Sequence, residues 1–236
     1  MLLQIFGPEA TWPDQDLVAF STEFSADLAF AGYCAGVFPM PLHEDNFGGD
    51  FGGEMGWWSP IHRGILPLDA LRVTRSLAQA TRRYTTTVDA AFGEVLDHCG
   101  DPARESGWID DEVKAVYAEL YERGCVHSIE TWDASGRLVG GLYGVSIGGL
   151  FAGESMFHDP TFGRDASKVA LVRLVDILRS SGDDRLLDVQ WRTDHLASLG
   201  VREISRRAYL RDLERALDAT PTVWPSAATS LRGAHA

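Results

Sequence analysis

Apolar and polar positions are most regularly ordered between residues 138 and 190, and this order predicts a hairpin, a helix and a strand. Leu138 to Ile147 and Leu150 to Phe157 are apolar runs separated by Gly148-Gly149, which is typical of two antiparallel strands around a tight turn. Apolar residues then recur at three-residue steps from Ser167 to Leu178, as on one face of an amphipathic helix. Leu186 to Gln190 is a further extended segment.

Two polar residues, Asp188 and Gln190, interrupt this last apolar segment. Because they are two positions apart on a predicted strand, we expect their side chains to share one face of the sheet. Polar groups are costly to bury without a partner, so a functional use is favoured. The alternative is a pair at the edge of a strand, exposed to solvent.

The remaining pattern predicts an α+β protein with two domains, a small α/β domain at residues 1–100 and a second domain at 101–236 with a mixed, mainly antiparallel sheet. We expect residues 1 to 24 to be irregular. The acidic and glycine-rich stretch 44–56 is expected to be mobile, and the tail from residue 220 is expected to be frayed. Other helices are predicted at Ser25–Ala35, Thr74–Thr81, Asp89–Cys99, Asp110–Glu122, Thr193–Leu199 and Ser205–Ala219, and other strands at Arg63–Leu68, Tyr84–Val88 and Val126–Asp133.

Composition is that of an ordinary globular chain. Its 236 residues are 45% hydrophobic and 23% charged, and no apolar run approaches the roughly 20 residues that cross a bilayer. The first residues lack the features of a secretory signal, so a cytoplasmic location is expected. The cysteines Cys34, Cys99 and Cys125 are too widely spaced for a disulfide framework or a paired metal site, and we predict reduced thiols and no metal.

The formal charge of −13 argues against general binding of nucleic acid, since phosphate affinity comes from clustered Lys and Arg. Any such contact must be local. Four arginines, Arg72, Arg75, Arg82 and Arg83, fall within a dozen residues and could bind phosphates. The alternative is a solvated helix surface.

Three other features suggest sites. Trp57 and Trp58 are adjacent on an extended segment, so one could enter the core while the other stays available for a flat ligand such as a base; core packing of both is the alternative. Glu154 lies in an apolar strand, where it needs a basic ligand or an internal salt bridge to an arginine. His127 and His195 are candidate proton donors, although lone histidines more often serve packing.

Several segments together resemble one family over residues 15 to 214. The runs AGYCAGVFPM, WWSP, TRSL, GWIDDEV, HSIETW, GGLYGVSIGGLFAGESMF, ASKVAL, LDVQ and HLASLG are similar, in order, to the bacterial leucyl/phenylalanyl-tRNA–protein transferases. The resemblance implies a C-terminal domain of the GNAT acyltransferase type. It also implies transfer of Leu or Phe from aminoacyl-tRNA to the N-terminal Arg or Lys of a protein, which marks that protein for degradation.

The resemblance also implies roles for individual residues. Asp188 and Gln190 match the family's catalytic pair, and Glu154 matches an acidic residue near the acceptor. The residues that match those around the tRNA 3′ end are Tyr33, Trp108 and the WWSP stretch with Trp57 and Trp58. Those in positions of the amino-acid pocket are Tyr117, Leu142, Phe151, Met156 and Leu174.

Two departures from the family pattern bear on these roles. Met40 stands where many members have a Trp, so stacking there could shift to Trp57 or Trp58. Leu142 and Leu174 replace a Met and a Phe of some members, which leaves the preference between Leu and Phe open. The expected enzyme needs no cofactor, acts as a monomer and has no membrane partner.

Two other functions compete with this expectation. A coenzyme A-dependent N-acetyltransferase would carry the pattern Arg/Gln-x-x-Gly-x-Gly/Ala before a helix, but residues 161–166 read TFGRDA, and Asp165 would repel phosphate. A non-enzymatic binder of basic protein N-termini would need Glu154 but neither Asp188 nor Gln190.

Overall fold

Two sheets organise the protein. The computed structural model describes residues 5–42, 54–104, 108–226 and 231–232. The smaller sheet has the strand order β1-β3-β2, and the larger has the order β10-β4-β9-β8-β7-β6-β5-β11. Of the neighbouring strands in the larger sheet, only β8 and β9 run parallel, so the expected α+β class with a mixed, mainly antiparallel sheet is confirmed.

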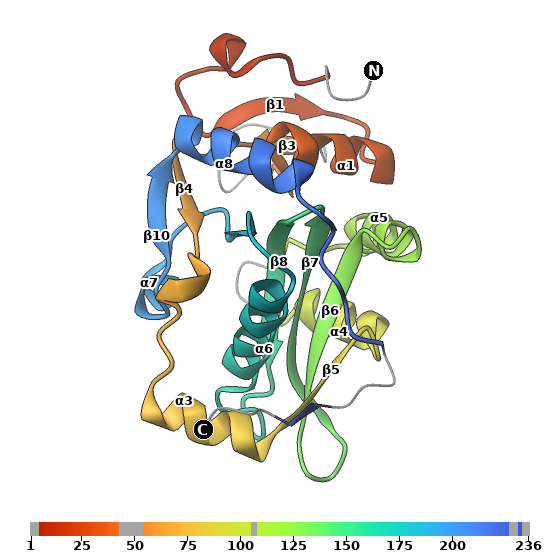
Figure 1. The fold of residues 1–236 in the computed structure, drawn as a ribbon. Helices are drawn as coiled ribbons and strands as arrows, with labels where there is room; N and C mark the ends of the chain where they lie inside the picture. Colours follow the sequence, from red (N-terminus) through yellow and green to blue (C-terminus); the bar gives the residue numbers. More distant parts are fainter. Residues whose placement is uncertain (1–4, 43–53, 105–107, 227–230, 233–236) are drawn as a thin grey trace.

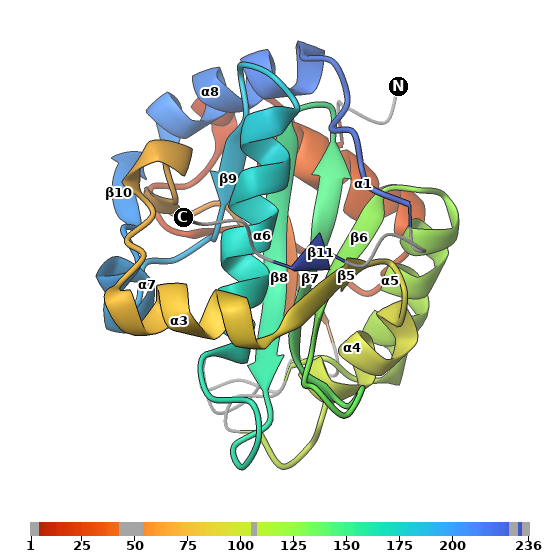
Figure 2. The ribbon, with the colours of Figure 1, turned by 60° about the horizontal axis from the view of Figure 1, so that its bottom comes forward.

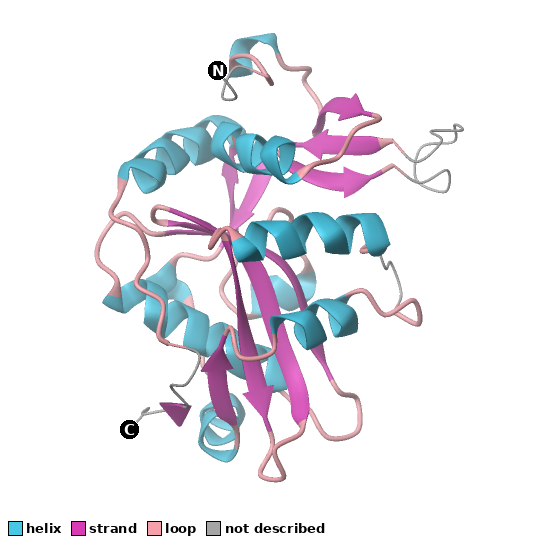
Figure 3. Ribbon diagram, turned by 90° about the vertical axis from the view of Figure 1, so that its right-hand side faces the viewer, coloured by secondary structure: helices cyan, strands magenta, loops and turns pink. Residues whose placement is uncertain are grey.

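The smaller sheet forms one end of the molecule, together with the helix α1 (Figures 1 and 3). Its strands are β1 (Leu17–Ser21), β2 (Phe38–Pro41) and β3 (Met55–Trp58), and α1 spans Ala26–Ala35. The prediction that residues 1 to 24 are irregular is therefore wrong for β1, whose partner strand lies far along the chain. Met55 and Gly56 are buried in β3 rather than mobile, and residues 44–53 of the predicted loop lie outside the described residues.

The larger sheet contains the predicted hairpin and its flanking strands. Gly148 and Gly149 form the turn between β7 and β8, and Gly148 has a φ of +58° that a tight turn requires. The strands are β4 (His62–Ile65), β5 (Thr85–Val88), β6 (Val126–Trp132), β7 (Leu138–Ile147), β8 (Leu150–His158), β9 (Leu186–Asp188), β10 (Arg202–Ser205) and β11 (Leu231–Arg232).

Helices cover both faces of this sheet. Leu142 of β7 packs in the apolar cluster with α6, whereas its neighbour Tyr143 packs on the other face with α4 and α5. Figure 2 shows α6 running alongside β8, with α3 lying across the lower end of α6. The helices are α3 (Arg75–Arg83), α4 (Phe92–Cys99), α5 (Asp111–Glu122), α6 (Ala166–Ser180), α7 (Asp194–Ser198) and α8 (Arg206–Asp218), with 3-10 turns η2 (Glu9–Thr11) and η3 (Leu68–Ala70).

The predicted domain boundary after residue 100 does not separate the two sheets. Strands β4 and β5 precede that position, yet they pair with β9 and β6 of the larger sheet. The change from one sheet to the other falls instead after Trp58, at Ser59 and Pro60. Backbone pairing between distant segments, which local composition does not reveal, causes this difference.

Residues 220–226 are held in place rather than frayed, and the rest of the predicted tail, apart from residues 231–232, lies outside the described residues. The backbone N–H of Thr222 donates to the carbonyl of Gly148 at 3.0 Å, and that of Val223 donates to Ser181 Oγ at 3.3 Å. Arg185 Nη1 donates to the carbonyl of Thr220 at 2.6 Å. The segment therefore crosses the β7–β8 turn and the end of α6 before β11 pairs with β5.

Candidate functional site

Glu154 lies in a β-bulge of the predicted hairpin. Tyr143 pairs with Ser155 and the next residue, Gly144, pairs with Gly153, so Glu154 has no partner on β7. Bulges bend a strand and redirect a side chain, and they are frequent beside active sites. The local irregularity explains how an acidic side chain of an apolar strand faces other polar groups.

The carboxylate of Glu154 is held by neutral donors. Tyr117 donates its hydroxyl to Oε2 at 2.7 Å, and Gln190 donates its side-chain amide to Oε1 at 3.3 Å. The hydroxyl of Tyr33 lies 2.6 Å from that of Tyr117, which extends the network to α1. Within the part of the chain that the structure describes, Glu154 forms no salt bridge, so the alternative of an internal pair with an arginine is not supported.

Burial raises the pKa of the Glu154 carboxyl to about 7, even though hydrogen bonds from Tyr117 and Tyr33 lower it. The charge of Asp188 adds to the rise, and that of Arg63 opposes it. Desolvation disfavours a carboxylate that has no counterion. A cationic ligand would supply that counterion and favour the ionised form.

Asp188 lies in a different environment, although β9 is the neighbour of β8. Its side chain is 0% exposed. Arg63 donates to it twice, from Nε at 2.8 Å and from Nη2 at 2.6 Å, and the hydroxyl of Tyr209 donates at 2.9 Å. A fourth donor is the backbone N–H of Gln190, at 2.9 Å. With these four donors the carboxylate is fully engaged inside the protein, so exposure to solvent is excluded.

The sequence predicted that Asp188 and Gln190 share one face of a strand. This prediction is wrong. Strand β9 ends at Asp188, and Gln190 has a φ of +58°, in the left-handed region. The turn is fixed on both sides, because Gly64 donates to the carbonyl of Gln190 at 2.8 Å while Asp188 accepts from its N–H. Asp188 therefore orients the backbone of Gln190, and the side-chain amide turns toward Glu154 instead.

An apolar cavity of about 140 Å³ opens beside Glu154 and Gln190, which both line it. Four of the five predicted pocket residues contribute, and the sequence reasoning missed Leu66, Leu171, Leu187, Leu196 and Val201 from elsewhere in the chain. Tyr117 does not line it, because α5 covers the opposite face of the sheet. The four that do are Leu142, Phe151, Met156 and Leu174.

A second cavity, of about 170 Å³, borders the same two residues. Trp108 and Trp191 contribute aromatic walls, and Glu154 and Gln190 line it as they line the first cavity. Met40 also lines it, with Phe38 and Pro39. Glu154 and Gln190 thus stand where an apolar cavity and an aromatic cavity meet.

The tryptophan pair serves the core. Trp57 is 1% exposed and donates its indole N–H to Ser21 Oγ at 2.9 Å, and Trp58 is 6% exposed and donates to the carbonyl of Met40 at 3.2 Å. The expectation that one of them stays available for stacking is wrong, because both faces of the small sheet are covered. Trp58 instead packs edge-on against Trp191, with ring centroids 5.7 Å apart.

Trp191, Arg63 and Tyr209 lie at the candidate site but were missed by sequence reasoning. Trp191 directly follows Gln190, and a tryptophan beside a predicted catalytic residue was a usable signal. Arg63 was the one basic residue among the apolar neighbours of its predicted strand. Nothing in the local sequence marks Tyr209, whose hydroxyl reaches Asp188 from α8.

The two candidate histidines line neither cavity. His127 places Nδ1 2.7 Å from Asp89 Oδ2 and stacks on Trp224. His195 is exposed on α7. Packing, the alternative left open from the sequence, describes His127, whereas His195 lies at the surface.

The four arginines are exposed on and before α3, at the opposite end of the molecule from β1 and β3 (Figure 1). Arg83 donates Nη2 to the carbonyl of Arg164 and to the hydroxyl of Tyr84, each at 3.0 Å. The positions of Arg72, Arg75 and Arg82 are compatible with a solvated helix surface as well as with a phosphate site.

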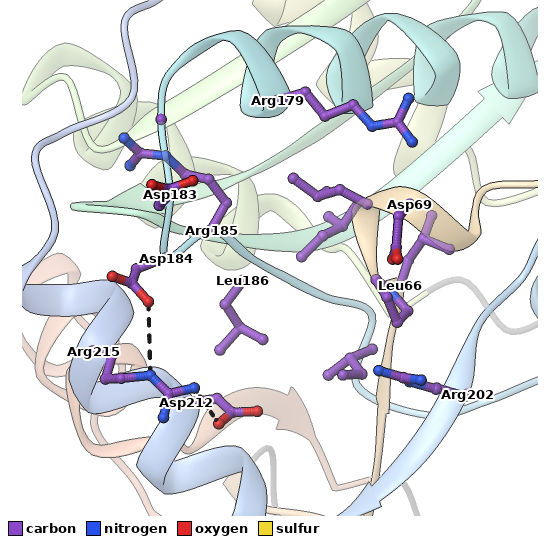
Figure 4. Close-up of a pocket in the computed structure, with 15 residues that line it drawn as sticks. Leu66, Asp69, Arg179, Asp183, Asp184, Arg185, Leu186, Arg202, Asp212 and Arg215 are labelled. Atoms are coloured by element: carbon purple, nitrogen blue, oxygen red, sulfur yellow. Dashed lines mark hydrogen bonds and ion pairs between the residues drawn. The ribbon is translucent and has the colours of Figure 1, made fainter.

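A larger hollow of about 470 Å³ has a charged lining and does not include Glu154 or Gln190 (Figure 4). Part of its charge is paired internally, since Arg215 lies 3.7 Å from Asp184 and 2.9 Å from Asp212. Among the described residues, no three His, Cys, Asp or Glu side chains converge as metal ligands. None of the described helices combines the length and apolar character that crossing a membrane requires.

Comparisons with known proteins identify relatives of this chain. Residues 65–214 match the family described as leucyl/phenylalanyl-tRNA protein transferase. A protein of Afipia carboxidovorans named leucyl/phenylalanyl-tRNA–protein transferase is 46% identical over 201 residues, covering 84% of each chain. One of a Ruegeria species with the same name is 50% identical over 196 residues, covering 82% of this chain and 87% of its own. The solved structure of L-PGS from Bacillus licheniformis is similar over 65% of this chain and 57% of its own, at 13% identity; its TM-score of 0.36 is too low to establish a common fold.

Proposed function

We propose that this chain, which belongs to the leucyl/phenylalanyl-tRNA protein transferase family, transfers Leu or Phe to the N-terminal Arg or Lys of acceptor proteins and so marks them for degradation. Membership of the family makes the chain an aminoacyltransferase that uses aminoacyl-tRNA. The observation that carries the proposal is the place of Glu154 and Gln190, on the common wall of the apolar and the aromatic cavity.

The apolar cavity suits the aminoacyl side chain. Its volume of about 140 Å³ is close to the roughly 150 Å³ of an apolar cavity that holds a benzene ring. A phenyl or isobutyl group therefore fits, while a charged side chain would lose its hydration without a partner. The walls from Leu142, Phe151, Met156 and Leu174 support selection of Leu and Phe.

Glu154 suits the acceptor. Its carboxylate has neutral hydrogen-bond donors but no counterion among the described residues, and it borders both cavities. The cationic side chain of an N-terminal Arg or Lys would supply the missing charge through a charge-assisted hydrogen bond. An acidic or neutral first residue would not.

The chemistry joins an amine to an ester carbon. The neutral α-amino group forms the new C–N bond, the ester C–O bond breaks, and the ribose oxygen takes a proton. Because an α-amino group titrates near 7.7–8.0, a useful fraction is neutral without a strong base. Gln190 donates its amide N–H to Glu154, which leaves the amide oxygen to accept from the attacking amine. Asp188 acts as a positioning residue, since it is buried and holds the backbone of Gln190.

The tRNA 3′ end would occupy the aromatic cavity. Trp108 and Trp191 line it, and Trp108 is partly exposed. Trp57, Trp58 and Tyr33 would support this wall from the core rather than stack on a base. We further propose that the arginines on and before α3, Arg72, Arg75, Arg82 and Arg83, contact tRNA phosphates.

The catalytic unit is proposed to be of the GNAT type. Three antiparallel strands, β6 to β8, are followed by α6 and by β9, which pairs parallel to β8. This order supports the fold that the sequence resemblance implies. A monomer in the cytoplasm without a cofactor remains the proposed state of the enzyme.

Coenzyme A chemistry fits less well. Asp165, at the start of α6, is paired with Lys168 at 2.9 Å, and its carboxylate occupies the position where the helix would meet a pyrophosphate. A simple binder of basic N-termini would explain Glu154 but not the apolar cavity beside it.

Single-turnover transfer of labelled Phe from phenylalanyl-tRNA tests the proposal. A peptide that begins with Arg should receive Phe, whereas the same peptide with an acetylated N-terminus should not. Acetyl-coenzyme A in place of the tRNA should give no product. Acetyl transfer, or failure of the wild-type protein to transfer either Phe or Leu, would overturn the proposed function.

A further inference from the structure

Phe151 forms one wall of the apolar cavity, and its ring has two close neighbours, Gly144 and Trp224. The ring is fully buried. A Cβ added at Gly144 would lie 2.5 Å from its Cε1, so the glycine leaves the space that the ring fills. The indole of Trp224 also packs against this ring, with the ring centroids 5.7 Å apart and the planes tilted by 50°.

Trp224 is itself held in place. It stacks on His127 with the centroids 4.2 Å apart and an interplanar angle of 21°. Asp89 fixes the imidazole through Nδ1 at 2.7 Å. The β7–β8 turn holds the segment that carries Trp224, because the backbone N–H of Thr222 donates to the carbonyl of Gly148 at 3.0 Å. The indole is thus a fixed support and not a loose tail residue.

We propose that Trp224 is a positioning residue that sets the size of the amino-acid cavity by holding the ring of Phe151. The inference rests on the proposed function, in which that cavity takes the aminoacyl side chain. Without the indole, the ring of Phe151 gains room to move away from the cavity. The cavity then deepens, so a phenyl group keeps its contacts while an isobutyl group leaves a void.

The experiment compares kcat/KM for leucyl-tRNA and phenylalanyl-tRNA, with one Arg-initiated peptide as acceptor. For Trp224→Ala, the ratio of phenylalanyl to leucyl transfer should rise about tenfold, the size of discrimination that one methylene in an apolar pocket provides. Val223→Ala is the matched control, because its side chain is 73% exposed on the same segment. That variant should keep the wild-type ratio.

The outcomes separate the two proposals. Equal losses for both substrates in Trp224→Ala, or an unchanged ratio, would overturn the role of Trp224 while the proposed function stands. A wild-type protein that transfers neither amino acid would overturn the proposed function itself. If Trp224→Ala does not fold, Trp224→Phe keeps an aromatic contact and should shift the ratio in the same direction by a smaller factor; an unchanged ratio there would contradict the inference.

Discussion

Asp188 and Glu154 lie on neighbouring strands of one sheet, yet their surroundings are opposite. Asp188 is fully buried, faces the guanidinium of Arg63 and accepts from four donors. Glu154 is partly buried, accepts from the neutral side chains of Tyr117 and Gln190, and borders two cavities. We propose that the internally neutralised carboxylate serves the structure, and that the one without a counterion among the described residues meets a ligand.

Removal of the Asp188 carboxylate should have the largest effect on stability. Asp188→Ala leaves the buried guanidinium of Arg63 without its partner, and breaking a buried pair in this way costs about 3–5 kcal/mol. Urea unfolding measures the loss. Asp97→Ala is the control, since Asp97 pairs with Lys114 but is 74% exposed, and such a surface pair contributes below about 1 kcal/mol. Equal losses in the two variants would show that the ion pair of Asp188 does not hold the site together.

Glu154→Gln should instead stabilise the protein, and only at the higher pH values. The pKa of Glu154 rises from 4.5 to about 7 on folding, so the folded state binds more protons than the unfolded state between these values. The stabilisation that comes from protonated Glu154 is complete below pH 4.5. As the pH rises through 7 it is lost, which lowers the free energy of unfolding by up to about 3 kcal/mol.

The glutamine variant cannot ionise, so this loss should be absent from it. Unfolding free energies of both proteins at pH 5 and pH 8 measure the difference. Wild type and Glu154→Gln should diverge at pH 8. If the difference in unfolding free energy between the two proteins is the same at pH 5 and at pH 8, ionising the carboxylate costs no stability. The contrast between Glu154 and Asp188 would then fail.

Gln190 links the two carboxylates, and its side chain and backbone can be tested separately. Gln190→Ala and Gln190→Gly should each lower kcat about 10²-fold, the loss typical of one preorganised polar group. They should differ in stability, because glycine adopts the φ of +58° without strain and alanine does not, a difference of about 1 kcal/mol. Transfer at the wild-type rate in both variants would remove the side chain from the reaction.

The smallest effect concerns the arginines of α3, far from both carboxylates. Replacing Arg82 and Arg83 by Ala should flatten the slope of log K against log salt for tRNA binding by about one to two units. The reason is that binding releases fewer counterions when it makes fewer phosphate contacts. The exposed Arg207 and Arg211 of α8 provide the matched pair. A slope that changes only in the Arg207 and Arg211 variant would place the RNA on α8.

The sequence predicted those elements whose signals are local. The β7–β8 hairpin and α6 follow from short-range periodicity and a glycine turn, and both occur close to the predicted bounds. Strand β1 was missed because its pairing with β3 depends on a distant segment. For the same reason the larger sheet includes β4 and β5, which the predicted boundary at residue 100 had assigned to another domain.

The structure brings together several of the residues that the sequence singled out, while their functional roles stay predictions. Glu154, Gln190 and four apolar wall residues do meet. The role of Asp188 could not be predicted, because its partner Arg63 is 125 positions away in the chain. The bulge at Glu154 and the left-handed turn at Gln190 depend on register and on tertiary hydrogen bonds, which a pattern of apolar positions does not specify.

The most direct test asks which carboxylate, Glu154 or Asp188, recognises the positive charge of the acceptor's first residue. Two peptides that differ only in their first residue, Arg or its neutral analogue citrulline, receive Phe from phenylalanyl-tRNA. Wild type should prefer Arg by roughly 10- to 100-fold in kcat/KM, the range of a charge-assisted hydrogen bond. Glu154→Gln should lose that preference, while Asp188→Asn should retain it at a lower rate. A Glu154→Gln enzyme that still prefers Arg as strongly as wild type would contradict the assignment of Glu154 to the acceptor.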